Sequence, residues 1–138
     1  DGLVLIGDAF AFLDPVFSSG VYLALTTGSI GADAVAEALD EGDVSARQFQ
    51  QYGERVCMGI EWMRKLVYAF YDDDFSFKDV VMKYAEVRRD LTDCLIGDLI
   101  DRDYSDLFEK VSEFAELPDE LPHGKAVARE AMAERAVS

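Results

Sequence analysis

The chain has 138 residues, of which 50% are apolar and 12% aromatic, and this is enough for one domain with a buried core. Its 28 acidic and 13 basic residues give a formal net charge of -15, which argues against nucleic acid or an anionic membrane surface as a partner. No run approaches the roughly 18 apolar residues of a membrane span, and the first residues lack a basic start and a cleavage site, so we expect a cytoplasmic protein without a signal peptide.

The apolar run at residues 3–6 (LVLI), which ends at Gly7, predicts a strand buried on both faces, as in a parallel sheet. Such a strand needs neighbouring strands, whereas the rest of the chain predicts only helices. We therefore expect the strand to be left from a truncated α/β domain whose other strands lie upstream of Asp1. The chain as it stands is then mainly α, with one N-terminal strand followed by about six helices.

The helices follow from apolar residues at spacings of three and four. The first is expected over residues 21–39, with Gly42 as its stop. The second is expected from about residue 46 to 71, after a capping box formed by Ser45 and Gln48. Further helices are expected to begin at Ser76, near Leu91 and at Ser105. A proline-containing linker at residues 116–124 and an alanine-rich helix over residues 125–138 complete the chain.

Cysteine and histidine, which are common metal ligands, are scarce in this chain, with two cysteines and one histidine. Cys57 and Cys94 lie far apart in helical patterns, which favours two buried free thiols over a disulfide or a metal site. His123 is the single histidine and lies in the expected linker. The three aspartates at residues 72–74 lack the further ligands of a calcium-binding loop, so we expect a solvated turn and no metal.

Residues 7–21 (GDAFAFLDPVFSSGV) combine several residue types that are suited to binding a ligand. Gly7 allows a sharp turn at the carboxyl end of the expected strand, where ligands of open α/β sheets bind. Asp8 then offers a carboxylate that accepts hydrogen bonds from sugar-type hydroxyls. Pro15 stiffens the loop, and Ser18, Ser19 and Gly20 lead into a helix N-terminus whose free N–H groups attract anions.

Residues 7–9 (GDA) together with residues 12–21 (FLDPVFSSGV) closely resemble the second FAD-binding motif of proteins with the flavin-dependent monooxygenase fold. The form Asp-Pro-x-Phe-Ser-Ser-Gly is most similar to flavin-dependent halogenases and their relatives. The wider group includes aromatic hydroxylases and geranylgeranyl-reductase-like enzymes. The resemblance is strong over residues 3–39 and looser beyond them.

The resemblance implies a role for each motif position. Asp8 would accept a hydrogen bond from a ribityl hydroxyl of FAD, and residues 15–21 would line the isoalloxazine ring. Backbone N–H groups around Ser19, Gly20 and Val21 would face the pyrimidine edge, and in the halogenases a halide sits at the positions that match Ser19 and Gly20. The implied cofactor-binding residues are Gly7, Asp8, Pro15, Ser18, Ser19, Gly20 and Val21.

Other parts of the family pattern are absent from these 138 residues. The Gly-x-Gly-x-x-Gly of the FAD pyrophosphate site, the lysine that relays hypohalous acid and the Trp-x-Trp-x-Ile-Pro motif would all lie upstream of Asp1. The resemblance therefore assigns no catalytic residue. It implies that residues 1–40 are the C-terminal end of an FAD-binding domain and that residues 41–138 are a helical C-terminal region.

The expected function is thus that of an inactive fragment of an FAD-dependent oxidoreductase, of halogenase or monooxygenase type, that supplies the ribityl- and isoalloxazine-facing segment. The complete enzyme would bind FAD and a small-molecule substrate, with a flavin reductase or NAD(P)H as electron source, and could form a homo-oligomer. Alternatives are a geranylgeranyl-reductase-like flavoenzyme and a non-catalytic helical protein-binding module. The aromatic residues expected nearest to a substrate are Tyr68, Phe70, Tyr71, Phe75 and Phe77.

Overall fold

The computed structural model describes residues 2–121. These residues form five α-helices and three short 3₁₀ helices. The α-helices are α1 (Gly20–Glu41), α2 (Gln50–Phe70), α3 (Phe77–Lys83), α4 (Arg88–Leu95) and α5 (Ser105–Val111). The 3₁₀ helices are η1 (Gly7–Ala9), η2 (Pro15–Phe17) and η3 (Ala85–Val87). The predicted mainly helical fold is confirmed, whereas His123 and the helix expected over residues 125–138 lie outside the described residues.

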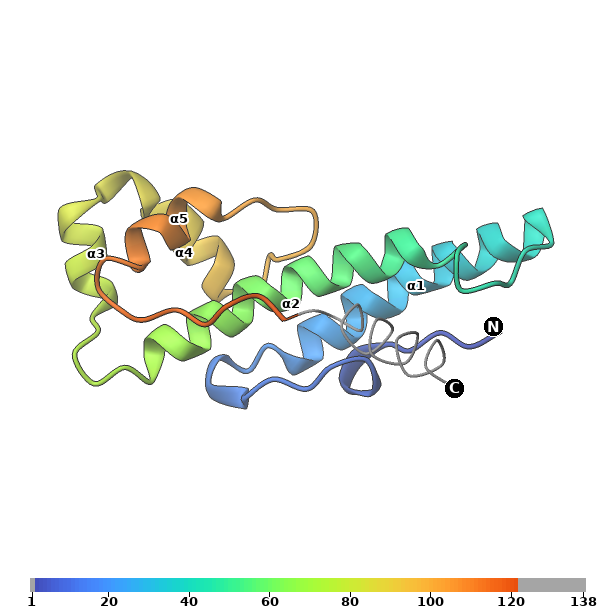
Figure 1. Cartoon of the computed structure of the whole chain (residues 1–138), viewed down its shortest axis with the longest axis horizontal. Coiled ribbons are helices and arrows are strands. Elements are labelled where there is room, and N and C mark those ends of the chain that lie inside the picture. The colour runs from blue at the N-terminus through green and yellow to red at the C-terminus, as the bar shows by residue number, and fades with distance from the viewer. Residues whose placement is uncertain (1, 122–138) are drawn as a thin grey trace, which may run out of the picture.

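The two long helices α1 and α2 lie side by side and run in opposite directions, and α3, α4 and α5 gather at the C-terminal half of α2 (Figure 1). The main core therefore forms where α2 meets these three short helices, around the fully buried side chains of Met63, Leu66, Leu99 and Leu107. A smaller core cluster of Tyr52, Val56 and Ile60 packs the other half of α2 against the N-terminal segment and α1.

Helix α1 confirms the predicted helix and its stop. Gly42 adopts a left-handed conformation (φ 70°), and its N–H donates to the carbonyls of Ala38 and Leu39. Gly31 permits a close contact between elements, because an added Cβ would lie 3.2 Å from Cγ2 of Ile6 and 3.4 Å from the Tyr52 ring. These contacts hold the N-terminal segment and α2 against the same face of α1.

Helix α2 begins at Gln50, later than expected, because the capping box does not form. Asp43 accepts a hydrogen bond from the N–H of Ser45 at 2.9 Å, and the side-chain amide of Gln48 donates to Glu41 at 2.9 Å. The backbone N–H of Ser45 and the side chain of Gln48 are thereby used in the turn between α1 and α2. The expected apolar face is buried at Tyr52, Val56, Ile60, Met63 and Val67.

Residues 3–6 do not form the expected strand, and the structure contains no strand within residues 2–121. A strand requires a neighbouring strand to satisfy its backbone groups. Here the N–H of Gly2 donates to the carbonyl of Val44, and the hydroxyl of Tyr52 donates to the carbonyl of Leu5 at 2.7 Å. Leu3 is 76% exposed, so the burial that the apolar run predicts is also missing. A role for this run in the sheet of a larger domain stays a prediction.

Two of the three short helices begin where the sequence predicts, because α5 starts at Ser105 and Ser76 directly precedes α3, whereas α4 starts earlier than expected. Helix α4 starts at Arg88, directly after η3, and ends before Gly97, whose φ of 93° stops it. Cys94 is buried in α4 and Cys57 is half-buried in α2, and neither forms a disulfide. The aspartates at residues 72–74 form the expected turn, in which Asp72 accepts a hydrogen bond from the N–H of Asp74.

Candidate functional site

The segment of residues 7–21, here called the motif segment, folds against the N-terminal half of α1. Gly7 adopts a left-handed conformation (φ 52°), and its N–H donates to the hydroxyl oxygen of Thr27 at 2.9 Å. Thr27 is buried, and its hydroxyl donates to the carbonyl of Leu23 at 2.6 Å. The turn at Gly7 is therefore tied to the second turn of α1 through one buried hydroxyl group.

Asp8 and Gly20 lie next to each other at the start of α1. An added Cβ on Gly20 would lie 3.9 Å from Oδ1 of Asp8 and would meet no other atom within 4 Å. Both residues are exposed. Since the first N–H groups of an α-helix have no acceptor within the helix, this end of α1 offers bare backbone donors beside an exposed carboxylate. A flat, polar ligand can approach such a surface without meeting a side chain.

The loop between η1 and α1 is shaped by Asp14 and Ser18. The Asp14 carboxylate accepts a hydrogen bond from the N–H of Val16 at 3.1 Å and caps η2, in which Pro15 is the first residue. The N–H of Ser18 donates to the carbonyl of Pro15 at 2.8 Å, and Ser18 adopts a left-handed conformation (φ 55°). Ser19 is buried. The loop thus turns the chain sharply into α1.

Residues 70–77, which join α2 to α3 and are here called the elbow, pack against this loop. The ring of Phe17 meets Phe70 edge-on at 5.3 Å between centroids and Phe77 at 6.4 Å, and Phe75 packs on Phe77 at 4.7 Å. The structure therefore brings the rings of Phe70 and Phe77 into contact with the motif segment, and Phe75 packs behind them on Phe77. Tyr68 instead packs against Arg64, whose guanidinium carbon lies 5.7 Å from the centroid of the Tyr68 ring.

Tyr71 links the elbow to the motif segment by a polar contact. Its hydroxyl donates to the Asp14 carboxylate at 3.0 Å, and this hydrogen bond to a negatively charged acceptor raises the pKa of Tyr71. The bond joins residues that are 57 positions apart in the sequence. Tyr71 is thus the second fixed partner of Asp14, besides the N–H of Val16.

The predicted site residues lie around the start of α1. Gly7, Asp8 and Gly20 lie together at the start of α1, and Ser19 is the residue that precedes this helix. Pro15 and Ser18 shape the loop beside them, whereas Val21 is 72% exposed on the outer side of α1. Sequence reasoning missed Thr27 as the partner of Gly7 and Asp14 as the partner of Tyr71, because neither residue pair is close in the chain.

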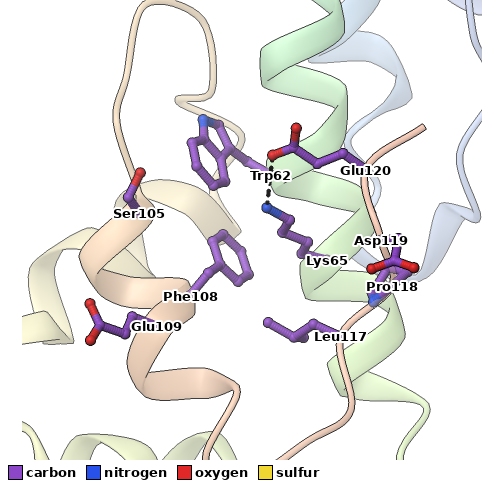
Figure 2. Close-up of a pocket in the computed structure, with 9 residues that line it drawn as sticks. All are labelled: Trp62, Lys65, Ser105, Phe108, Glu109, Leu117, Pro118, Asp119 and Glu120. Atoms are coloured by element: carbon purple, nitrogen blue, oxygen red, sulfur yellow. Dashed lines mark hydrogen bonds and ion pairs between the residues drawn. The ribbon is translucent and has the colours of Figure 1, made fainter. Parts of the chain in front are cut away.

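Among the cavities of the described residues, two lie along α2 and away from this surface. One, of about 400 Å³, is lined by Trp62 and Lys65 of α2, by Phe108 of α5 and by residues 117–120 (Figure 2). There Trp62 stacks on Phe108 with ring centroids 5.5 Å apart, so its indole packs between α2 and α5. The other, of about 610 Å³, follows α2 and includes Phe10 as its single residue from the motif segment. Among the described residues no cluster suited to a metal ion is found.

Comparison with known proteins identifies the family. Residues 1–86 match the tryptophan halogenase family, and this match covers the motif segment, α1, α2, α3 and the elbow. The chain belongs to the tryptophan halogenase family. The resemblance inferred from residues 7–21 is thereby confirmed. No helix within residues 2–121 is long and apolar enough to cross a membrane.

Curated relatives of this tryptophan halogenase family member have more than one activity. The chain is 32% identical over 113 residues to the 1H-pyrrole-2-carbonyl-[peptidyl-carrier protein] chlorinase of Pseudomonas fluorescens, which covers 82% of this chain and 25% of the chlorinase. It is 30% identical over 91 residues to the corresponding brominase of Pseudoalteromonas luteoviolacea, covering 60% of this chain and 22% of the brominase. It is also 32% identical over 85 residues to the digeranylgeranylglycerophospholipid reductase of Methanocella arvoryzae, covering 62% of this chain and 20% of the reductase. The chain spans a quarter or less of the length of these relatives.

Proposed function

We propose that residues 7–21 form the ribityl- and isoalloxazine-facing part of an FAD site in an oxidoreductase of halogenase type. The observation that carries this proposal is the arrangement at the start of α1, where the Asp8 carboxylate lies beside the bare backbone of Gly20. The family match over residues 1–86 supports it. A bound flavin would supply the redox chemistry, because it accepts and donates electrons.

The residues at this surface fit a flavin. A side chain at position 20 would stand where the ring has to approach, and Gly20 leaves this space open. The Asp8 carboxylate would accept a hydrogen bond from a ribityl hydroxyl. The N–H groups at the start of α1, around Ser19, Gly20 and Val21, would face the polar edge of the ring and stabilise negative charge there. Gly7, Pro15 and Ser18 would hold this surface in shape.

We also propose that residues 1–40 are the C-terminal end of an FAD-binding domain and that residues 41–138 are a helical C-terminal region. Support comes from the outer face of α1, where Val21, Leu25 and Leu39 are 72%, 71% and 67% exposed. Leu3 and Phe12 are similarly exposed on the N-terminal segment. Apolar surface of this extent requires a covering partner, and the sheet of an FAD-binding domain would provide one.

Binding of FAD is tested with the product of the complete open reading frame that contains residues 1–138. The wild-type protein is expected to purify with a yellow flavin. Asp8→Ala should weaken FAD affinity by roughly ten- to a hundredfold, the range of a lost hydrogen bond to a charged group. Asp8→Asn retains an acceptor oxygen and should lose less. Asp40→Ala, an exposed aspartate at the other end of α1, is the matched control. A colourless wild-type protein without FAD affinity would refute the proposal.

The similarity to digeranylgeranylglycerophospholipid reductases supports a second candidate, a flavoenzyme that reduces isoprenoid double bonds. The two reactions are distinguished by supplying the protein with FAD, a flavin reductase, NADH, chloride or bromide, and either an aromatic compound or a prenylated lipid. A halogenated aromatic product supports the halogenase, whereas saturation of the prenyl chain supports the reductase. Mass spectrometry of the products distinguishes these outcomes.

A further inference from the structure

Two segments that are far apart in the sequence meet beside the proposed flavin surface. One is the loop of residues 14–18, which leads into α1, and the other is the elbow of residues 70–77. Their contact has a polar part, between Asp14 and Tyr71, and an apolar part, between Phe17 and the rings of Phe70 and Phe77. The end of α2 is thereby connected to the start of α1 at two separate points.

The polar part controls the orientation of Asp14. Its Oδ1 atom accepts the N–H of Val16 at 3.1 Å and the hydroxyl of Tyr71 at 3.0 Å. Without Tyr71 the carboxylate would keep one of these two partners and would be free to rotate. Because Asp14 caps η2, its orientation decides whether the turn that contains Pro15 and Val16 stays closed.

The same turn determines the conformation of Ser18. The N–H of Ser18 closes η2 by donating to the carbonyl of Pro15 at 2.8 Å. Ser18 has a left-handed conformation (φ 55°), which a residue with a side chain keeps when the surrounding structure holds it there. Ser18 directly precedes Ser19 and Gly20, whose backbone faces the proposed ligand. A change at Asp14 is therefore transmitted to that backbone within a few residues.

We propose that Tyr71 is a positioning residue, whose hydrogen bond to Asp14 makes the end of α2 hold residues 14–18 in the conformation that presents the start of α1. Tyr71 acts through Asp14 and not through contact with a ligand. The helical region thereby helps to shape the motif segment in addition to packing beside it. The effect on a flavin rests on the function proposed above, whereas the effect on the loop does not.

The effect on the loop is measured in the 138-residue chain by the water-exchange rate of the Ser18 amide, followed by NMR. Tyr71→Phe and Asp14→Ala should each raise this rate roughly three- to tenfold, the range for one lost hydrogen bond. The double variant should exchange no faster than Asp14→Ala alone, because the two residues act as one unit. If Tyr71 and Asp14 stabilised the chain independently, their effects on the exchange rate would instead multiply in the double variant.

Tyr84→Phe is the matched control. The Tyr84 hydroxyl also joins two elements through a carboxylate, that of Glu113 at 2.8 Å, but it lies at the end of α3 and contacts no residue of the motif segment. This variant should leave the Ser18 rate unchanged. An unchanged rate in Tyr71→Phe, additive effects in the double variant, or an equal increase in Tyr84→Phe would each overturn the proposal.

The consequence for the cofactor is measured with the product of the complete reading frame. Tyr71→Phe and Asp14→Ala should each weaken FAD binding at least roughly threefold and shift the visible absorption band of the bound flavin, and Tyr84→Phe should do neither. If the wild-type protein binds no FAD, the proposed function fails, and the positioning role is then judged by the exchange rates alone. If FAD binds but neither property changes in Tyr71→Phe, the effect on the flavin site is excluded.

Discussion

Gly7 combines a left-handed backbone with a close approach to α1 that an added side chain would crowd. An added Cβ would lie 3.2 Å from Cβ and 3.3 Å from Cα of Ala24. The Cα belongs to the backbone of α1 and cannot move aside. We therefore expect Gly7→Ala to lower the free energy of unfolding by about 2 kcal/mol, of which about 1–2 kcal/mol is the cost of the left-handed conformation. Urea unfolding followed by circular dichroism measures this change.

The control for this prediction is Gly53→Ala. Gly53 lies in α2, and an added Cβ there would meet nothing within 4 Å. The same substitution should raise the free energy of unfolding by about 0.5–1 kcal/mol, because alanine is the better helix former. Equal effects of the two substitutions would show that the contact between Gly7 and Ala24 is not restrictive.

At this scale the site residues proposed from the sequence are ones that lie close together in the chain. Gly7, Asp8 and Gly20 belong to one contiguous motif, so their chemistry could be recognised without a structure. Thr27 and Tyr71 could not be assigned, because they lie 20 and 57 residues from their partners Gly7 and Asp14. The sequence around a threonine or tyrosine in a helix does not indicate which distant loop its hydroxyl group will contact.

At the scale of elements, the helices formed as the sequence predicted, whereas the predicted strand at residues 3–6 did not form. The periodicity of α1 and α2 is a property of each segment alone, and both helices form where apolar residues recur every three or four positions. A strand depends on a neighbour that the segment does not contain. The start of α2 was misplaced for a similar reason, because the Ser45 N–H donates to Asp43 and the Gln48 side chain donates to Glu41, so the reciprocal bonds of a capping box do not form.

The buried thiol of Cys94 in α4 predicts a pH dependence of the free energy of unfolding. Cys94 is fully buried, and this burial raises its pKa from 9.0 to about 12. Below about pH 9 the thiol is protonated in both states and contributes no pH dependence. Between about pH 9 and pH 12 the unfolded chain loses the proton first, so the free energy of unfolding falls as the pH rises. The loss should reach about 2 kcal/mol near pH 10.5, at about 1.36 kcal/mol per pH unit.

The Cys94→Ala variant isolates this contribution. Burial also raises the pKa of the neighbouring Tyr104, so this residue adds its own contribution to the pH dependence of stability. The measured quantity is therefore the difference in free energy of unfolding between wild type and variant at about pH 8 and about pH 10.5. This difference should shrink by about 2 kcal/mol at the higher pH. A difference independent of pH would show that Cys94 ionises as readily in the folded protein as in the unfolded chain.

For the whole molecule, the spacing of apolar residues predicted the helical class but not the arrangement of the helices. Nothing in the sequence indicated that α3, α4 and α5 would gather at one end of α2 (Figure 1). That arrangement determines the site, because it bends the chain at residues 70–77 and so brings Phe70 and Phe77 to Phe17. Contacts of this kind depend on the angles between helices, which are set by the packing of many side chains at once.

The net charge of -15 is a property of the whole molecule with a measurable consequence. Repulsion among the excess carboxylates opposes the compact state, whereas exposed ion pairs such as Arg55–Asp101 each contribute at most about 1 kcal/mol. The pair of Arg64 and Glu61 is largely buried and is screened little by salt. Raising the salt from about 10 mM to about 100 mM shortens the screening length from about 30 Å to about 10 Å. Because repulsion outweighs the exposed pairs, we expect the melting temperature to rise by a few degrees, as measured by circular dichroism.

The choice of anion separates screening from binding at the start of α1. Screening depends on ionic strength, so sodium chloride and sodium acetate at equal concentration should raise the melting temperature equally. An anion held by the N–H groups beside Gly20 would stabilise the folded chain by mass action, and the effect would then differ between the two salts. A melting temperature that falls with either salt would show that the ion pairs outweigh the repulsion of the 28 acidic residues.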